Sequence, residues 1–354
     1  MKSFVYFSVF AVLIFTLSIF SIQDAYAATI TAAPAGGNWN TGSTWIGGVA
    51  PVTADTKIIP AGITVTVSSS IINSGTIANS GAIVVSSATD GIENSVAGIF
   101  NNNSGGTITI SNSGIGTGIV NSGNFANSGT ITVSNTGSSA GIENSLTFTN
   151  SGTITISNSG GTGVGISLSS STFTNSGTIT VSNTAGDGMD NFGTFTNSGT
   201  ITIQNSGSSI GIYNDDVFSN SGSITVSNTA GTGIENTMSG TLDNNFAGII
   251  TNSGTIVNSG SINNQCGSTY LGTEPTIHSV IDACAPCNPD PDNWFITSSC
   301  QLTIDATVTG NVTVQSSSVL VIPNEKTLNI DFATKHLLII SGSKVLIKSG
   351  GKII

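Results

Sequence analysis

The sequence predicts an all-β protein, a right-handed parallel β-helix (solenoid) with coils of about 23 residues. One observation is a recurring block, Phe-x-Asn-Ser-Gly-Thr-Ile-Thr in its commonest form, that starts at Phe125, Phe148, Phe173, Phe195 and Phe218. The steps between these Phe residues are 23, 25, 22 and 23 residues, and such a fixed period is typical of solenoids, whose repeats bury their apolar faces against neighbouring repeats. A second observation is that the chain contains no Asn-Gly, the strongest short hairpin signal. Stacked parallel coils are therefore favoured over antiparallel hairpins.

Each repeat contains three short strand signals. In Thr130-Ile-Thr-Val-Ser134 the apolar and polar residues alternate, which is typical of a half-buried strand. A second apolar position follows in Gly141-Ile142-Glu143-Asn144, and the next Phe supplies the third. Three strands separated by Asn/Ser/Gly turns fit one coil, and roughly eight such coils are expected to stack.

Stacking would align equivalent residues of successive coils. The five Phe residues are expected to form an interior column of stacked rings. Asn side chains stacked one coil apart can bond to each other. Two Asn columns are predicted to be structural for this reason: Asn127, Asn150, Asn175, Asn197 and Asn220, and Asn135, Asn158, Asn183, Asn205 and Asn228.

Residues 1–27 have the pattern of a signal peptide. Lys2 precedes the apolar stretch from Phe4 to Ile22, and Ala25-Tyr26-Ala27 forms an A-x-A cleavage site. The alternative is an uncleaved membrane anchor, because the apolar run nearly spans a bilayer. The sequence thus predicts a secreted or cell-surface protein. Its predicted divisions are a signal peptide (1–27), an N-terminal capping segment (28–72), the β-helix repeats (73–265), a Cys-containing insert (266–300) and a C-terminal β-strand segment (301–354).

Two flanking segments resemble known proteins. Residues 38–66, with Trp39, Trp45 and several Gly residues, resemble the N-terminal segment of many secreted β-strand-repeat (parallel β-helix) surface proteins. The closing run from Lys344 to Lys352 resembles the C-terminal segments of exported repeat proteins from ammonia-oxidising archaea. The first resemblance implies that Trp39 and Trp45 cap the open core of the first coil; the alternative is a sugar-stacking pair.

The four cysteines, Cys266, Cys284, Cys287 and Cys300, lie in one window. In an exported protein an even number predicts two disulfides, with three possible pairings. The rival interpretation is a zinc site, for which Cys284-Ala-Pro-Cys287 supplies one half.

Asn288, Asp290 and Asp292 place oxygen ligands at alternate positions, as in the first half of a calcium loop. The turn Gly and the distal Glu of such a loop are missing, so a solvated acidic turn is favoured over calcium. No other cofactor is predicted.

The charge of −11 is unevenly distributed. No Lys or Arg lies between Lys57 and Lys326, which excludes nucleic acid as a partner because phosphate contacts need basic residues. Residues 73–265 carry a net charge of −9 and residues 301–354 a net charge of +2. This asymmetry favours head-to-tail self-association.

The repeats offer little catalytic chemistry. Both His residues lie outside them, and no Lys or Arg is present to assist a pair of acids. We therefore expect no enzyme activity. If the chain were a polysaccharide hydrolase or lyase, its catalytic residues would be Asp187, Asp190, Asp215 and Asp216.

Two repeated surfaces could bind a partner. The variable position of Gly-Ile-x-Asn carries Glu93, Glu143, Asp190, Tyr213 and Glu235 in separate repeats, which predicts either a solvated edge or a strip that binds a glycan or a cation. A ladder of Thr-x-Thr, from Thr130/Thr132 to Ser223/Thr225, resembles the ice-binding face of some antifreeze proteins, although Thr is also a common exposed strand residue.

The sequence therefore predicts an exported structural or adhesive protein of the cell surface, with an extracellular glycan or surface polymer as its partner. A polysaccharide-active enzyme is the alternative, and an ice-binding protein is a minor one.

Overall fold

The computed structural model describes residues 27–354 except 113, 136–138, 159–162, 184–185, 206–207, 229–230, 246, 267, 272–280 and 349. The predicted signal peptide thus lies outside the described residues, apart from Ala27. In the described part, no helix is both long and apolar enough to cross a membrane.

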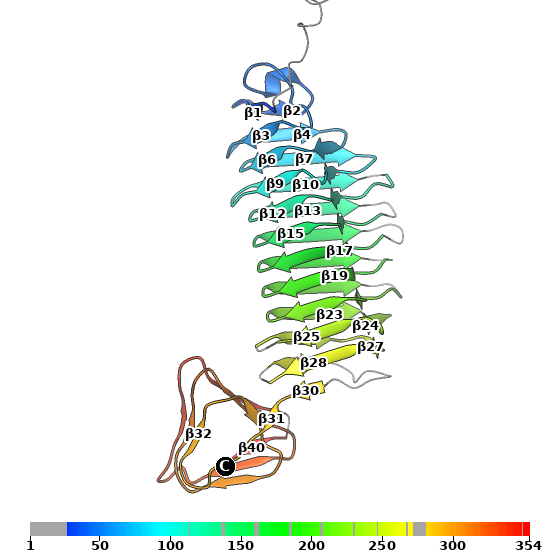
Figure 1. The fold of residues 1–354 in the computed structure, drawn as a ribbon. Helices are drawn as coiled ribbons and strands as arrows, with labels where there is room; N and C mark the ends of the chain where they lie inside the picture. The colour runs from blue at the N-terminus through cyan, green and yellow to red at the C-terminus, as the bar shows by residue number, and fades with distance from the viewer. Residues whose placement is uncertain are drawn as a thin grey trace, which may run out of the picture.

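The chain folds as an all-β parallel solenoid, which confirms the predicted fold class; the right-handed sense stays a prediction. Figure 1 shows a rod of stacked strands that begins at the N-terminal side and continues into a second, smaller body at the C-terminal end. The structure contains about 13 turns, more than the eight expected, because both flanking segments also form coils. Every named strand pair in the described residues is parallel, and an isolated antiparallel bridge joins Ala32 to Trp45.

The rod has three columns of strands. The first column carries the Phe residues: β1 (Thr29–Thr31), β3 (Thr56–Ile59), β6 (Thr76–Asn79), β9 (Ile99–Asn102), β12 (Asn124–Asn127), β15 (Thr147–Asn150), the end of β17 (Ile166–Asn175), the end of β19 (Met189–Asn197), β22 (Val217–Asn220), β25 (Thr241–Asn244), β28 (Ser261–Gln265) and β30 (Ile281–Ala283).

The second column contains the Gly-Ile-x-Asn segments: β5 (Ile71–Asn73), β8 (Ile92–Asn94), β11 (Ile119–Asn121), β14 (Ile142–Asn144), the starts of β17 and β19, β21 (Ile212–Asn214), β24 (Thr232–Asn236) and β27 (Thr255–Asn258). The third column carries Thr-x-Thr: β2 (Gly37–Asn38), β4 (Thr64–Val67), β7 (Ala82–Ser87), β10 (Thr107–Asn112), β13 (Thr130–Asn135), β16 (Thr153–Asn158), β18 (Thr178–Asn183), β20 (Thr200–Asn205), β23 (Ser223–Asn228), β26 (Ile249–Asn252) and β29 (Thr269–Leu271).

Alternation within each strand fills the core. In β13 Ile131 and Val133 are buried while Thr130 and Thr132 face outward. The Phe rings stack in the interior with centroids 4.5 to 5.0 Å apart and nearly parallel planes, and the column begins one coil earlier than the repeat pattern indicated, at Phe100. Burial of each ring and its offset contact with the next ring both stabilise the stack.

A buried Asn ladder runs beside the Phe column, as predicted. Asn127 Nδ2 donates to Asn150 Oδ1 over 2.7 Å, and Asn150 Nδ2 donates to Asn175 Oδ1 over 2.7 Å. The ladder continues through Asn197, Asn220, Asn244 and Asn264 and starts at Asn79. The other predicted Asn column is the one from Asn135 to Asn228. Its residues are the last residues of β13, β16, β18, β20 and β23, and their backbones pair in register. Their side chains lie outside the described part of the structure.

The second Asn ladder lies instead in the second strand column. It links Asn73, Asn94, Asn121 and Asn144, and then Asn191, Asn214, Asn236 and Asn258. At its N-terminal end the buried Lys57 donates from Nζ to Asn73 Oδ1 over 2.9 Å and to the backbone carbonyl of Thr53. Burial, opposed by the charge of Asp55, lowers the pKa of Lys57 to about 8.

The turns of the rod explain the Asn-Ser-Gly motif. A Cβ atom at Gly152 would lie 2.0 Å from the carbonyl oxygen of Gly129 in the preceding coil, and Gly177 meets Gly152 in the same way. Glycine is required there because the stacked backbones approach too closely for any side chain.

The N-terminal segment closes one end of the rod. Trp39 and Trp45 are 6% and 2% exposed, contact each other edge to face at 5.1 Å, and join the hydrophobic core. Trp45 Nε1 also donates to the Trp39 carbonyl over 2.7 Å. The 3₁₀ turn η1 (Gly42–Thr44) lies between them. The rings therefore pack as a cap, and their burial contradicts the sugar-stacking alternative.

The C-terminal body has its own core. Its three small sheets contain β31 (Ala285–Pro286), β33 (Cys300–Gln301), β36 (Val319–Ile322) and β39 (Lys344–Ile347); β32 (Trp294–Ile296), β35 (Val312–Val314) and β38 (Leu337–Ile339); and β34 (Ala306–Val308), β37 (Thr327–Ile330) and β40 (Lys352–Ile353). Trp294, Val312 and Leu328 are among the buried residues that form this separate cluster.

One disulfide lies at the C-terminal end of the rod and the other within the C-terminal body. Cys266 bonds to Cys284, and Cys287 bonds to Cys300, which confirms the predicted disulfides and identifies their pairing among the three possible ones. Since all four thiols are used in disulfides, they cannot form the alternative zinc site. Disulfides of this kind indicate an oxidising, extracellular type of environment.

Candidate functional site: an acidic and aromatic corner of the rod

The candidate strip of variable residues forms one outward column on the rod. Glu93, Val120, Glu143, Ser167, Asp190, Tyr213 and Glu235 pair in register from β8 to β24. Val120 lies in the coil between Glu93 and Glu143, so these two acids are not in adjacent coils. Glu143 Oε1 accepts a hydrogen bond from Thr117 Oγ1 over 3.3 Å. Only Asp190, Tyr213 and Glu235 occupy consecutive coils, so the strip concentrates at its C-terminal end.

The corner between the first two strand columns is unusual at these coils. In other coils a turn separates the two columns, but β17 and β19 run continuously through both. The register between β17 and β19 shifts between Ser169 and Thr172, because β17 has one residue more than β19 at this corner, and Ser170 has a φ of 47° there. At this corner the turn of the regular repeat is thus replaced by continuous strand, with one extra residue in β17.

Two aromatic rings lie at this corner. The residue after the ladder Asn is Ser95, Ser122 or Ser145 in earlier coils, but it is Phe192 in β19. Alternation in β19 directs Met189 and Asn191 inward and Phe192 outward, where it is 42% exposed. The ring of Tyr213 lies 5.5 Å from that of Phe192 at an angle of 46°. Val217 and Met238 are also exposed, 38% and 85% respectively.

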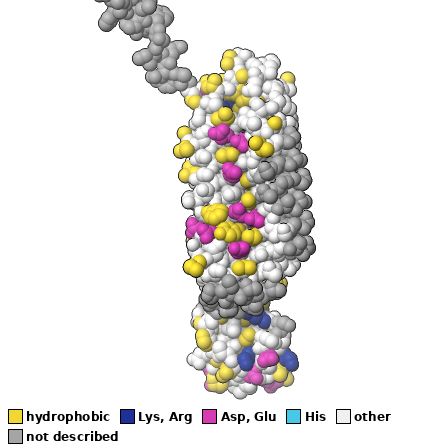
Figure 2. All heavy atoms as spheres, turned by 90° about the vertical axis from the view of Figure 1, so that its right-hand side faces the viewer, with side chains coloured by type: hydrophobic (Ala, Val, Ile, Leu, Met, Phe, Trp, Pro, Cys, Tyr) yellow, Lys and Arg dark blue, Asp and Glu magenta, His cyan; other side chains and the backbone are white. Residues whose placement is uncertain are grey.

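Carboxylates surround these rings, and we define Asp187, Asp190, Phe192, Tyr213, Asp215, Asp216 and Glu235 as the corner patch. Figure 2 shows acidic side chains along one side of the rod, with hydrophobic side chains gathered among them. Burial, and then the charges of Asp215, Glu235 and Asp190, raise the pKa of Tyr213. The rings of the corner patch therefore lie in a negative field.

Asp187 and Asp190 form a carboxyl pair. Burial first, then the charge of Asp187 and a hydrogen bond with it, raise the pKa of Asp190 to about 7. Asp187 Oδ1 also accepts from the backbone N–H of Ile210 over 2.7 Å. Asp90 accepts from the backbone of Thr117 in the same way, so this contact is a structural feature of the repeat.

The other two acids of the predicted catalytic set, Asp215 and Asp216, lie in the turn that follows β21. Asp215 accepts a hydrogen bond from Thr237 Oγ1, and Asp216 is exposed. Asp187 and Asp190 thus lie one coil away from Asp215 and Asp216, as their spacing indicated, with Asp187 before β19 and the other two acids after β21. His336, the His residue among those described, lies on the C-terminal body, away from this carboxyl pair.

The predicted calcium residues are differently placed. Asn288, Asp290 and Asp292 are exposed in a turn before β32, where Asp290 Oδ1 accepts from the backbone N–H of Asp292 over 2.9 Å. Across the described residues, no group of three or more His, Cys, Asp or Glu side chains could hold a metal ion.

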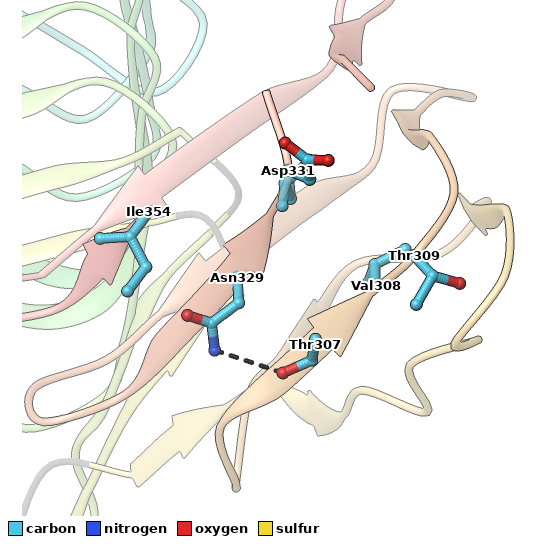
Figure 3. Close-up of a pocket in the computed structure, with 7 residues that line it drawn as sticks. Thr307, Val308, Thr309, Asn329, Asp331 and Ile354 are labelled. Carbon is cyan, nitrogen blue, oxygen red and sulfur yellow. Dashed lines mark hydrogen bonds between the residues drawn. The ribbon is translucent and has the colours of Figure 1, made fainter. Parts of the chain in front are cut away.

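A shallow pocket of about 520 Å³ lies on the C-terminal body between β34, β37 and β40. Figure 3 shows Thr307, Asn329 and Asp331 around it, with Asn329 Nδ2 donating to Thr307 Oγ1 over 3.4 Å. Asp331 is its one carboxylate and accepts from the Ala333 backbone and from Thr334 Oγ1. The residues that line this pocket include no second acidic side chain and no aromatic ring.

The Thr face forms the third column of the rod. Thr130, Thr153, Thr178 and Thr200 are exposed and in register, and Ser223 continues the row. This array is regular along the rod, whereas the corner patch is local. No protein-family model matches the chain, and no curated protein matches it.

Proposed function

We propose that this protein is an exported structural rod of the cell surface that adheres to an extracellular glycan through the corner patch, without catalysis. The observation that carries the proposal is the exposed ring of Phe192, at a position where earlier coils carry Ser, in contact with the half-buried ring of Tyr213. Aromatic faces stack on the apolar faces of sugar rings, and neighbouring carboxylates accept hydrogen bonds from sugar hydroxyls. Such a shallow surface on a rigid rod suits adhesion.

The rod itself supports a structural role. The ladders of Phe and Asn repeat the same contacts coil after coil, and the two disulfides are compatible with an oxidising environment outside the cell. Export rests on the signal-peptide pattern of residues 1–27.

The test is a glycan and cell-wall polymer array probed with the protein and with Phe192→Ser, in calcium and in chelator, with released reducing sugar assayed in the same wells. We expect binding by the protein, loss of at least about tenfold in affinity in Phe192→Ser, and no released sugar. Phe192→Ser restores the residue of the earlier coils, so the variant should fold. Equal binding by both proteins would contradict the proposal.

A polysaccharide-cleaving enzyme is the second candidate. The Asp187–Asp190 pair favours it, because a carboxyl group with a pKa near 7 suits a general acid. Release of sugar that Asp190→Asn abolishes would establish this activity and overturn the non-catalytic proposal.

A further inference from the structure

The corner patch has a charge that restricts its ligand. The acids Asp187, Asp190, Asp215, Asp216 and Glu235 lie within the coils that carry Phe192 and Tyr213. The sequence has no Lys or Arg from residue 58 to residue 325, so no basic side chain of the rod offsets their charge. A neutral sugar would gain hydrogen bonds from these acids but no ionic attraction, and an anionic ligand would be repelled by them.

The two rings restrict the ligand further. A small inorganic cation would bind carboxylates without needing exposed aromatic faces, and no group of acids in the described residues is arranged to hold a metal ion. An organic cation uses both features, because an ammonium group is attracted to a ring face and forms charge-assisted hydrogen bonds with a carboxylate.

The ring geometry fits a ligand with an extended apolar face. Phe192 and Tyr213 are tilted by 46° with centroids 5.5 Å apart, so they form a step across two adjacent coils. Exposed Val217 and Met238 extend this apolar surface toward the coils of β22 and β24. Sugar units could lie over the rings while their amino groups reach the carboxylates on either side.

We propose that the corner patch selects glycans whose sugars carry free, protonated amino groups, that is, polymers of deacetylated hexosamine. This inference rests on the proposed function and names its ligand class. Phe192 and Tyr213 contact the pyranose faces, and Asp215 and Glu235 receive the ammonium groups.

The test compares two probes that differ only at nitrogen, glucosamine hexamer and N-acetylglucosamine hexamer, by calorimetric titration at about pH 5.5, where the sugar amine is protonated. The protein is compared with Phe192→Ser and Glu235→Gln. Val96→Ser is the control for Phe192→Ser, because it changes an exposed apolar residue outside the corner patch. Asp243→Asn is the control for Glu235→Gln, because it changes an outward acid outside the corner patch. Circular dichroism establishes that each variant is folded.

We expect the glucosamine hexamer to bind at least about tenfold more tightly than its acetylated form, and Phe192→Ser to lose about tenfold. Glu235→Gln should weaken binding of the amine form about threefold or more and leave the acetylated form unchanged. Both controls should bind like the unaltered protein.

Equal affinity for the two hexamers, lost in Phe192→Ser, would overturn the amine selectivity while the adhesive function stood. Amine binding that Phe192→Ser leaves unchanged would show diffuse ionic attraction to the rod and would also overturn the inference. Absence of binding to every glycan tested would refute both proposals.

Discussion

Asp190 is the residue whose ionisation departs most clearly from its ordinary behaviour. It lies partly buried beside Asp187, whose charge and hydrogen bond favour the protonated form, and Tyr213 and Glu235 follow in the same column. One oxygen, Oδ1, is buried with no hydrogen-bond partner in the described residues. An ionised Asp190 is therefore costly in the folded chain.

This cost predicts a pH-dependent stability. The pKa of Asp190 is about 7 in the folded state and 3.8 for the ordinary group, so the folded state binds the extra proton between these values. The free energy of unfolding should therefore fall as pH rises from about 4 to 7. Asp190→Asn should remove this decline and stabilise the protein at pH 8 by about 1–2 kcal/mol, after allowance for solvent screening. Denaturant unfolding from pH 4 to 8 measures it, and parallel profiles for the two proteins would contradict it.

At the scale of the element, the Asn ladders hold adjacent coils in register. Every amide in the middle of a ladder donates to the next coil and accepts from the previous one. Removing Asn150 therefore leaves the buried Asn175 Oδ1 without its donor, whereas Asn127 Nδ2 keeps the carbonyl groups of Gly129 and Thr153. Within the described residues, one ladder is interrupted at Leu168, which pairs in register with Asn144. There Ser171 Oγ accepts from Asn144 Nδ2 over 3.0 Å, which compensates for the missing amide.

Asn150→Leu should therefore destabilise the rod, because no serine is placed to replace its amide. We expect a loss of about 2–4 kcal/mol in the free energy of unfolding, measured by denaturant titration. Asn124→Ala in the adjacent coil is the control, because the Asn124 side chain is exposed, and it should change stability by less than about 0.5 kcal/mol. A loss in Asn150→Leu no larger than the control would show that the ladder contributes little.

The elements of the rod differed in how far the sequence could predict them. Fixed spacing identified the Phe column and the Asn127 ladder, because a period of one coil places equivalent residues in contact. In the Gly-Ile-x-Asn segments the prediction concerned the variable position and not the Asn beside it. The buried ladder that these Asn residues form was therefore missed, although their regular spacing could have revealed it. The four Asp residues were predicted as a group, but Phe192 was not singled out. The sequence feature that could have identified Phe192 is that it replaces the Ser that follows the ladder Asn in earlier coils. Its exposure could not be predicted, because it depends on β19 continuing as a strand through the corner.

At the scale of the whole molecule, two hydrophobic cores share one chain. The rod has the long core that begins at Trp39 and Trp45, and the C-terminal body has the smaller core around Trp294. Charge is divided in the same way, because all exposed Lys residues in the described part lie on the C-terminal body. Head-to-tail association between an acidic rod and a basic body stays a prediction, which light scattering at low and high salt can test.

The two cores predict two unfolding transitions by calorimetry. Cys287–Cys300 closes a loop with a sequence separation of 13 within the smaller body. Replacing both residues with Ala should destabilise that body by about 3 kcal/mol and leave the transition of the rod unchanged. Replacing Cys266 and Cys284, outside the smaller core, is the matched control and should affect that body less. A single transition that shifts as a whole would show that the two cores unfold together.

The most direct test of the corner patch as a binding site is a crystal structure of the protein with glucosamine hexamer bound. We expect electron density for sugar rings against Phe192 and Tyr213, with an amino group within hydrogen-bond distance of Asp215 or Glu235. Density on the Thr face or in the pocket beside Asp331, with the corner patch empty, would contradict it.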